Sequence, residues 1–166
     1  MRSGDQDAMR AARYALLAGS IAIAVNMLLL RWSAKAGLQT GQGSLSQLLV
    51  WLHTGRLMWQ LPSIGGIPAT VWRPVFHVVV GLLLAVIYAL FLEPRLRKVF
   101  TPLVSGLFYA LGIWLLNAWI VLPLLGMGIA GESIVPAIGM LYFAFAHTAF
   151  FVILSILYAK FLQRSS

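Results

Sequence analysis

Four polar side chains in the apolar stretches of this chain have the types and spacing to do chemistry. His77 and His147 stand 70 residues apart, and two histidines on separate helices are the minimum ligand set for a b-type haem. Asn26 and Asn117 are predicted at a similar depth on two further helices, so each helix gives one residue to a polar layer. Such a layer either hydrogen-bonds across the helices, binds a ligand or cofactor, or contacts a partner protein. We favour the first interpretation, which is packing.

Catalytic constellations are not evident. The sequence has no cysteine, which excludes disulfides, thiolate metal sites and cysteine nucleophiles. Intramembrane hydrolases need a nucleophile with a base, or paired carboxylates, and proton-coupled pumps use a buried carboxylate. We expect all four acidic residues to lie outside the apolar spans; they are Asp5, Asp7, Glu93 and Glu132. The sequence therefore predicts no catalytic residue and no metal site, and it disfavours an enzyme.

The elements that must position these residues are membrane helices. The 166 residues are 61% apolar and 10% charged, whereas soluble domains average about 45–50% and about 25%. A soluble fold of this size could not bury so much apolar surface. Segments of about 20 apolar residues, long enough to cross a bilayer, occur at about 11–30, 71–92, 103–125 and 137–162. We predict a single all-α membrane domain over residues 1–166 with four transmembrane helices.

The distribution of basic residues predicts the orientation. Four spans place both termini on one side, and cytoplasmic loops carry the excess of Lys and Arg. A net charge of +8 would suggest nucleic acid in a soluble protein, but here the basic residues flank the spans. With cytoplasmic termini, the inner side carries Arg2, Arg10, Arg13, Arg95, Arg97, Lys98, Lys160 and Arg164, and the outer side carries Arg31, Lys35, Arg56 and Arg73.

The first outer connection contains a predicted amphipathic helix over about residues 44–60. Its polar residues recur at spacings of 7, 3 and 4, which places them on one stripe; they are Ser46, His53, Arg56 and Gln60. The remaining positions are mostly apolar and include Leu45, Leu48, Leu49, Leu52, Trp51 and Trp59. We expect this helix to lie on the outer leaflet or against a partner, with the leucines facing lipid or protein and Arg56 facing water.

An internal repeat links the second and fourth spans. His77 is followed eleven residues later by Tyr88-Ala89, and His147 is followed eleven residues later by Tyr158-Ala159. The shared pattern predicts a duplicated helical hairpin, with two parallel repeats about an axis along the membrane normal. Eleven residues rise about 16 Å, so tyrosines at the inner interface would place the histidines near the midplane.

Short motifs suggest a family resemblance. A His-x-x-x-Gly stretch opens the second span at His77–Gly81, and Leu-Pro-x-x-Gly occurs at Leu61–Gly65 and Leu122–Gly126. With the doubled hairpins, these motifs resemble the YagU-like group of small bacterial inner-membrane proteins. In the fourth span, Phe151 stands where the second glycine would be expected. The resemblance implies a protein of the bacterial plasma membrane without an established enzymatic activity.

Three functions remain open from the sequence. The first choice is a non-catalytic subunit or accessory protein of a larger membrane complex, energy-transducing or electron-transporting, whose partners are the lipid bilayer and other membrane subunits and not nucleic acid. The second is a haem-binding electron-transfer protein that uses His77 and His147 as axial ligands. The third is a small transporter or channel, which the repeat and the polar layer favour.

Overall fold

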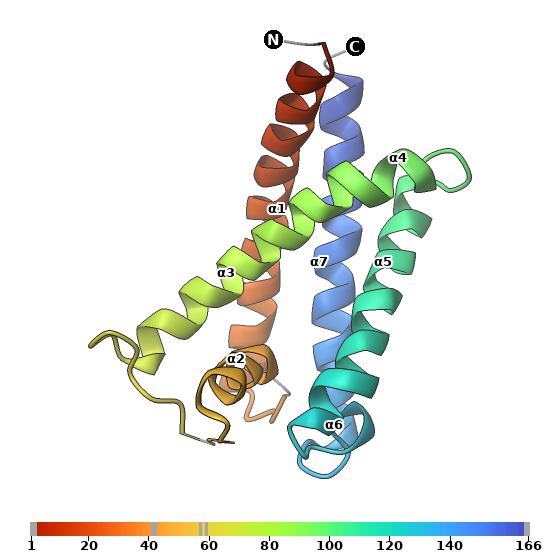
Figure 1. The fold of residues 1–166 in the computed structure, drawn as a ribbon. Coiled ribbons are helices and arrows are strands. Elements are labelled where there is room, and N and C mark those ends of the chain that lie inside the picture. The colour runs from red at the N-terminus through yellow and green to blue at the C-terminus, as the bar shows by residue number, and fades with distance from the viewer. Residues whose placement is uncertain (1–2, 41–42, 57, 59, 165–166) are drawn as a thin grey trace.

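The computed structural model of this chain describes residues 3–40, 43–56, 58 and 60–164 (Figure 1). Arg2 and Trp59 therefore lie outside the described residues. Within the described part, helices predominate, and the one extended pairing is an isolated bridge between Ile64 and Ile67. Four helical segments are long and apolar enough to cross a membrane, namely Asp5–Lys35, Ala69–Leu96, Pro102–Leu124 and Ala137–Gln163. The prediction of four membrane-spanning helices in an all-helical fold is confirmed at this level.

Each spanning segment is built from one or more helical elements. In chain order these are α1 (Ser3–Lys35), α2 (Ser44–Thr54), α3 (Ala69–Ile87), the π-helix η1 (Tyr88–Leu92), α4 (Glu93–Leu96), α5 (Pro102–Leu116), the π-helix η2 (Asn117–Val121), α6 (Leu122–Leu124), the 3₁₀-helix η3 (Ile129–Gly131) and α7 (Ala137–Gln163). The two ends of the chain lie at the same end of the bundle, and α2 and α6 lie at the other (Figure 1).

Local sequence explains where two of the helices begin and end. Thr101 caps α5, because its side chain accepts a hydrogen bond from the backbone N–H of Val104, and Pro102 follows at the first helical position. Gly55 ends α2 in the left-handed conformation, with φ of 65° and its N–H bonded to the carbonyl of Trp51. The prediction that α2 extends to about residue 60 was therefore wrong, because a left-handed glycine stops the helix at Thr54.

Two proline-associated π-helices carry their segments through positions where a helix normally ends. Proline lacks an N–H, and its ring clashes with the carbonyl four residues earlier. Directly before Pro94 and Pro123, the backbone widens so that Glu93 N–H bonds to the carbonyl of Tyr88 and Leu122 N–H bonds to that of Asn117. The second spanning segment consequently continues through Glu93. The helical segment of the second span therefore extends past its predicted end at about residue 92 and includes Glu93, as the segment of the first span includes Asp5 and Asp7. That the acidic residues lie outside the membrane itself stays a prediction.

Small residues allow close helix contacts around α7. α1 and α5 both pack along α7, and α3 packs across α1. A β-carbon built on Gly19 of α1 would lie 2.7 Å from the β-carbon of Ala85 on α3, and one on Gly106 of α5 would meet the backbone of α7. α3 meets α5 at the end that carries α4 and leans away from it toward the end that carries α2 (Figure 1). α3 therefore packs mainly on α1, and α5 packs mainly on α7.

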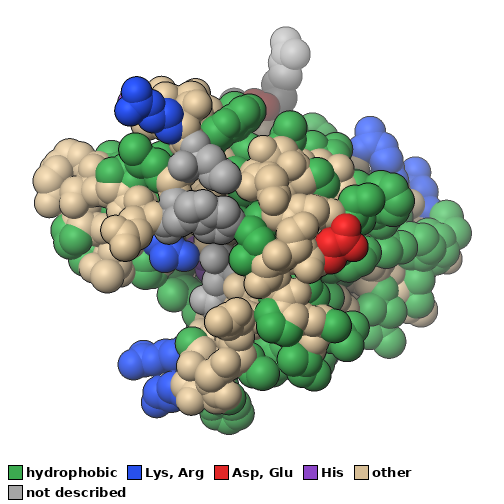
Figure 2. Space-filling view, turned by 90° about the horizontal axis from the view of Figure 1, so that it is seen from below, with side chains coloured by type: hydrophobic (Ala, Val, Ile, Leu, Met, Phe, Trp, Pro, Cys, Tyr) green, Lys and Arg blue, Asp and Glu red, His purple; other side chains and the backbone are tan. Residues whose placement is uncertain are grey.

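The α2 helix packs against the end of the bundle that carries α6 (Figure 1). Leu48 and Trp51 contact the cluster formed by Val121, Leu122, Leu125 and Met127, whereas Leu45, Leu49 and Leu52 are exposed. Ser46, which we expected on the water-facing stripe, is buried, because α2 turns this side toward the protein. Figure 2 shows this end of the molecule, where basic side chains lie at several points of the edge and acidic surface is scarce.

Candidate functional site

Asn26 links three helices at the centre of the predicted polar layer. Its side chain is 1% exposed on α1. The Nδ2 atom donates a hydrogen bond of 2.9 Å to the backbone carbonyl of Ala146 on α7, and the Oδ1 atom lies 2.9 Å from Nε2 of His77 on α3. One buried amide therefore holds α1, α3 and α7 in register.

The two histidines face each other across the bundle. Nδ1 of His147 lies 2.8 Å from the carbonyl of Phe143, one turn earlier on α7. The rings of His77 and His147 are nearly perpendicular, at 84°, with their centroids 6.2 Å apart. The ring of Phe143 covers His147 at a centroid distance of 4.0 Å. The imidazole of His147 is enclosed by the surrounding helices, whereas that of His77 is less completely buried.

The hydrogen bonds define which ring nitrogen carries the proton. The carbonyl of Ala146 can only accept, so the amide nitrogen of Asn26 faces it, and the amide oxygen faces His77. That oxygen also only accepts, and Nε2 of His77 must donate. The carbonyl of Phe143 requires Nδ1 of His147 to donate in the same way. Nδ1 of His77 and Nε2 of His147 therefore hold the free lone pairs.

Asn117 does not share a hydrogen bond or ring contact with the other three residues of the predicted layer. Its Oδ1 atom instead accepts a hydrogen bond of 3.4 Å from the hydroxyl of Ser44 on α2. Asn117 is also the first residue of η2, where the helical register changes. The structure therefore joins Asn26, His77 and His147, and it assigns Asn117 to the contact between α2 and the third span.

The surroundings of the histidine pair do not fit a haem. A porphyrin would need a flat space beside the pair, and Gly81, one turn after His77, is where the sequence could offer it. A β-carbon at Gly81 would lie 2.7 Å from Cδ1 of Ile23, so this face is already filled by an α1 side chain. Phe143 occupies one face of the second ring. The residues present fit a packed helix contact better than a porphyrin.

A second polar cluster lies at the end of the bundle that carries α4. Tyr88 and Tyr158 are each 2% exposed, with ring centroids 6.1 Å apart at 82°. Tyr88 stacks on Tyr109 at 5.6 Å, and its hydroxyl interacts with those of Ser105 and Ser155. We expected Tyr88 and Tyr158 at the inner membrane interface, and the structure encloses both rings between the helices. Their depth in the membrane stays a prediction.

Glu93 belongs to this cluster and was missed from the sequence. The residue is 7% exposed, and its carboxylate faces Tyr88 and Tyr158. Nε of Arg97, an exposed side chain one turn later, lies 3.9 Å from one carboxylate oxygen. The Glu-Pro-Arg sequence is typical of a loop, so composition alone gave no signal. The preceding apolar run, which contains no glycine from Leu82 to Leu92, was the available hint that the helix continues.

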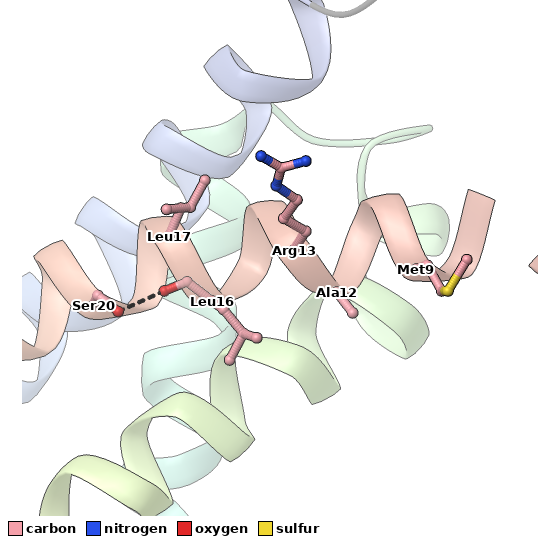
Figure 3. A pocket seen from close by; sticks show the side chains of 6 residues that line it. All are labelled: Met9, Ala12, Arg13, Leu16, Leu17 and Ser20. Atoms are coloured by element: carbon pink, nitrogen blue, oxygen red, sulfur yellow. Dashed lines mark hydrogen bonds between the residues drawn. The ribbon is translucent and has the colours of Figure 1, made fainter. Parts of the chain in front are cut away.

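A groove on the surface of α1 lies away from both clusters (Figure 3). Its lining comes from α1 alone and consists of Met9, Ala12, Arg13, Leu16, Leu17 and Ser20. The hydroxyl of Ser20 donates to the carbonyl of Leu16 on the same helix. Arg13 is the one charged residue of the lining. A groove on one helix, apolar apart from an arginine, is suited to contact with lipid and not to catalysis.

Comparison with known proteins adds no assignment. No family model, no curated protein sequence and no solved structure matches this chain. The resemblance to the YagU-like group therefore stays a prediction. Among the described residues there is also no group of three or more His, Asp or Glu that could hold a metal ion.

Proposed function

We propose that the protein is a non-catalytic integral-membrane subunit or accessory protein of a larger energy-transducing or electron-transport complex. The observation that carries the proposal is the incomplete burial of His77 on α3, the helix that leans away from α5 (Figure 1). Polar side chains at this depth are costly in hydrocarbon and normally face protein or water. A transmembrane helix from another subunit, seated where α3 leans away from α5, would complete the burial of His77.

The exposed face of α3 supports this arrangement. Residues one turn apart along the helix are all more than half exposed; they are Val71, Val75, Val79 and Leu83. β-branched and leucine side chains at a spacing of four form a continuous ridge that a second helix can pack against. Lipid also tolerates such a ridge, so the ridge supports the proposal together with the incomplete burial of His77 on the same helix.

The duplicated hairpin is part of the same proposal. Residues at equivalent positions of the two repeats meet in pairs, with similar geometry in each pair. His77 meets His147 at 6.2 Å and 84°, and Tyr88 meets Tyr158 at 6.1 Å and 82°. A two-fold axis between the repeats would produce such self-contacts. Under this symmetry α5 would pack along α3 as α1 packs along α7, and the divergence of α3 from α5 leaves the position for a partner (Figure 1).

The same proposal places the chain in the bacterial plasma membrane with cytoplasmic termini. The eight-to-four distribution of basic residues favours this orientation. The termini lie together at the end that also carries α4 and the basic Arg95–Lys98 segment. The end that carries α2 and α6 would then face outward, where α2 would act as an interfacial helix against the bundle.

Photo-crosslinking in native membranes tests the proposal. A photo-reactive amino acid replaces Val79 on the exposed ridge of α3, and a matched variant carries it at Leu28, which is equally exposed on α1. We expect a discrete crosslinked protein band from position 79 and only lipid adducts from position 28. Lipid adducts alone at both positions, in folded protein, would contradict the proposal, as would a band that consists of a second copy of this chain.

A small proton-coupled transporter is the second candidate, and the burial of Glu93 favours it. Such proteins use an intramembrane carboxylate as the proton carrier. The purified chain in liposomes would then acidify a lumen loaded with a pH dye when a solute gradient is applied, and Glu93→Gln would abolish the flux. Flux that is equal in wild type and Glu93→Gln excludes this carrier role.

A further inference from the structure

We propose that Nδ1 of His77 and Nε2 of His147 form a two-ligand site for one cuprous ion, Cu(I). The proposal does not depend on the function proposed above, and it goes beyond it. It rests on the direction of the hydrogen bonds, the separation of the rings and the charge of the surrounding groups.

The hydrogen bonds leave one lone pair free on each ring. Nε2 of His77 donates to Asn26 and Nδ1 of His147 donates to the carbonyl of Phe143. No hydrogen bond among the described residues reaches the second nitrogen of either ring. In metal sites, a ligating histidine almost always donates its other N–H to a carbonyl or a carboxylate, which fixes the tautomer and the ring orientation. Both histidines have that arrangement.

The separation of the rings matches a shared ion. A metal–imidazole bond is about 2 Å, and a ring nitrogen lies about 1.1 Å from its ring centre, so two imidazoles on opposite sides of one ion have centroids about 6 Å apart. The observed centroid separation is 6.2 Å. Edge-to-face contacts between aromatic rings span about 4.5–7 Å, and the Tyr88–Tyr158 pair has a similar separation of 6.1 Å. The spacing of the histidine rings is therefore compatible with an ion between them, and the free lone pairs distinguish this pair from the tyrosines.

The charge of the surroundings selects a monovalent, two-coordinate ion. The ligands are neutral, and the groups that the structure places around them are the amide of Asn26, backbone carbonyls and the ring of Phe143. The cost of placing an ion in a low-dielectric interior rises with the square of its charge, so a divalent ion with two neutral ligands is disfavoured. Imidazole suits copper, whereas Zn²⁺ prefers four ligands. Cu(I) accepts a linear pair.

Competition for Cu(I) tests the site. The full chain in lipid nanodiscs is titrated into the violet Cu(I)–bicinchoninate complex under a reducing, oxygen-free atmosphere. We expect withdrawal of one copper per chain, and X-ray absorption at the copper edge should show two nitrogen neighbours at about 2 Å. His77→Gln and His147→Gln should each lose this binding, whereas His53→Gln, on the exposed surface of α2, should bind as wild type does. Asn26→Ala should weaken binding by about 10–100-fold, because Asn26 positions His77.

Several outcomes would overturn the proposal. Wild-type protein that is helical and monodisperse but withdraws no copper would do so. Equal withdrawal by the double variant of His77 and His147 would assign the copper to another place. An absorption band of haem in the purified wild type that disappears in His147→Leu would assign the histidines to a porphyrin. If a glutamine variant fails to fold, the wild-type titration and the absorption spectrum decide between these results.

Discussion

Replacement of Gly106 by alanine should destabilise the contact between α5 and α7. The added β-carbon would lie 2.8 Å from the carbonyl oxygen of Phe151 and 2.8 Å from Cα of Val152, and it would also overlap the hydroxyl of Ser155. Two of these three neighbours are backbone atoms, so rotation of a side chain cannot relieve the overlap and the helices must separate. Overpacking of this kind costs about 1–3 kcal/mol.

Gly112 provides the matched control on the same helix. A β-carbon at Gly112 meets nothing within 4 Å. Both replacements remove a glycine from a helix interior, which by itself favours the folded state by about 0.5–1 kcal/mol. Because this gain is common to both, the free energies of unfolding of Gly106→Ala and Gly112→Ala should differ by about 1–3 kcal/mol.

Tryptophan fluorescence during unfolding in mixed micelles of increasing SDS content measures this difference. We expect the midpoint of Gly112→Ala at or above that of wild type and the midpoint of Gly106→Ala below it. Equal midpoints for the two variants would refute the argument that backbone proximity at Gly106 limits the approach of α5 to α7. A midpoint of Gly112→Ala as low as that of Gly106→Ala would show that helix flexibility, and not crowding, is the cause.

Three further predictions follow from the geometry. Alkaline phosphatase fused at the C-terminus should be inactive and the same reporter placed after residue 40 should be active, because the basic residues favour cytoplasmic termini; the opposite pattern reverses the orientation. Asn26→Leu should lower the free energy of unfolding by about 1 kcal/mol, since two interhelical hydrogen bonds are lost, and Asn117→Leu should lower it less; equal losses would contradict the assignment. Gln47→Met should raise thermal stability, because Oε1 of Gln47 is buried without a partner among the described residues, while Gln60→Met, at an exposed position, should not; a loss of stability at position 47 would reveal a partner for that oxygen.

Hydropathy was sufficient to find the four spans, because a helix of about 20 apolar residues matches the thickness of the hydrocarbon core of a bilayer. It was insufficient at Glu93. The widened turn before Pro94 contains one residue more than an α-helical turn, and it keeps the chain helical where a proline and two charges are typical of a loop. Such a turn depends on packing against neighbouring helices, which sequence periodicity does not contain.

The polar layer shows a similar limit. Depth along a helix follows from residue count, and the count correctly brought His77 level with His147 and Asn26. The direction of a side chain around the helix requires an unbroken register as well. The regular helix α5 keeps its register up to Asn117, so periodicity could give the direction of this side chain but not its partner, which is Ser44 of α2. The partner of Ser44 could not be inferred, because the path of the connection from α1 to α2 is set by tertiary contacts.

The pairing of α1 with α7 also has a consequence in time. α1 leaves the ribosome well before α7, yet Asn26 bonds to Ala146, 120 residues further along the chain. Until α7 is made, the side chain of Asn26 can form its hydrogen bond to His77 but not the one to the carbonyl of Ala146. The connection from α1 to α2 also lacks one of its contacts until α7 is made, because the carbonyl of Gln39 lies against Gly139 at the start of α7. In a nascent chain arrested before residue 137, Asn26 of α1 would therefore still lack its hydrogen-bond partner on α7. A membrane chaperone or a quality-control protease would bind the chain at this stage.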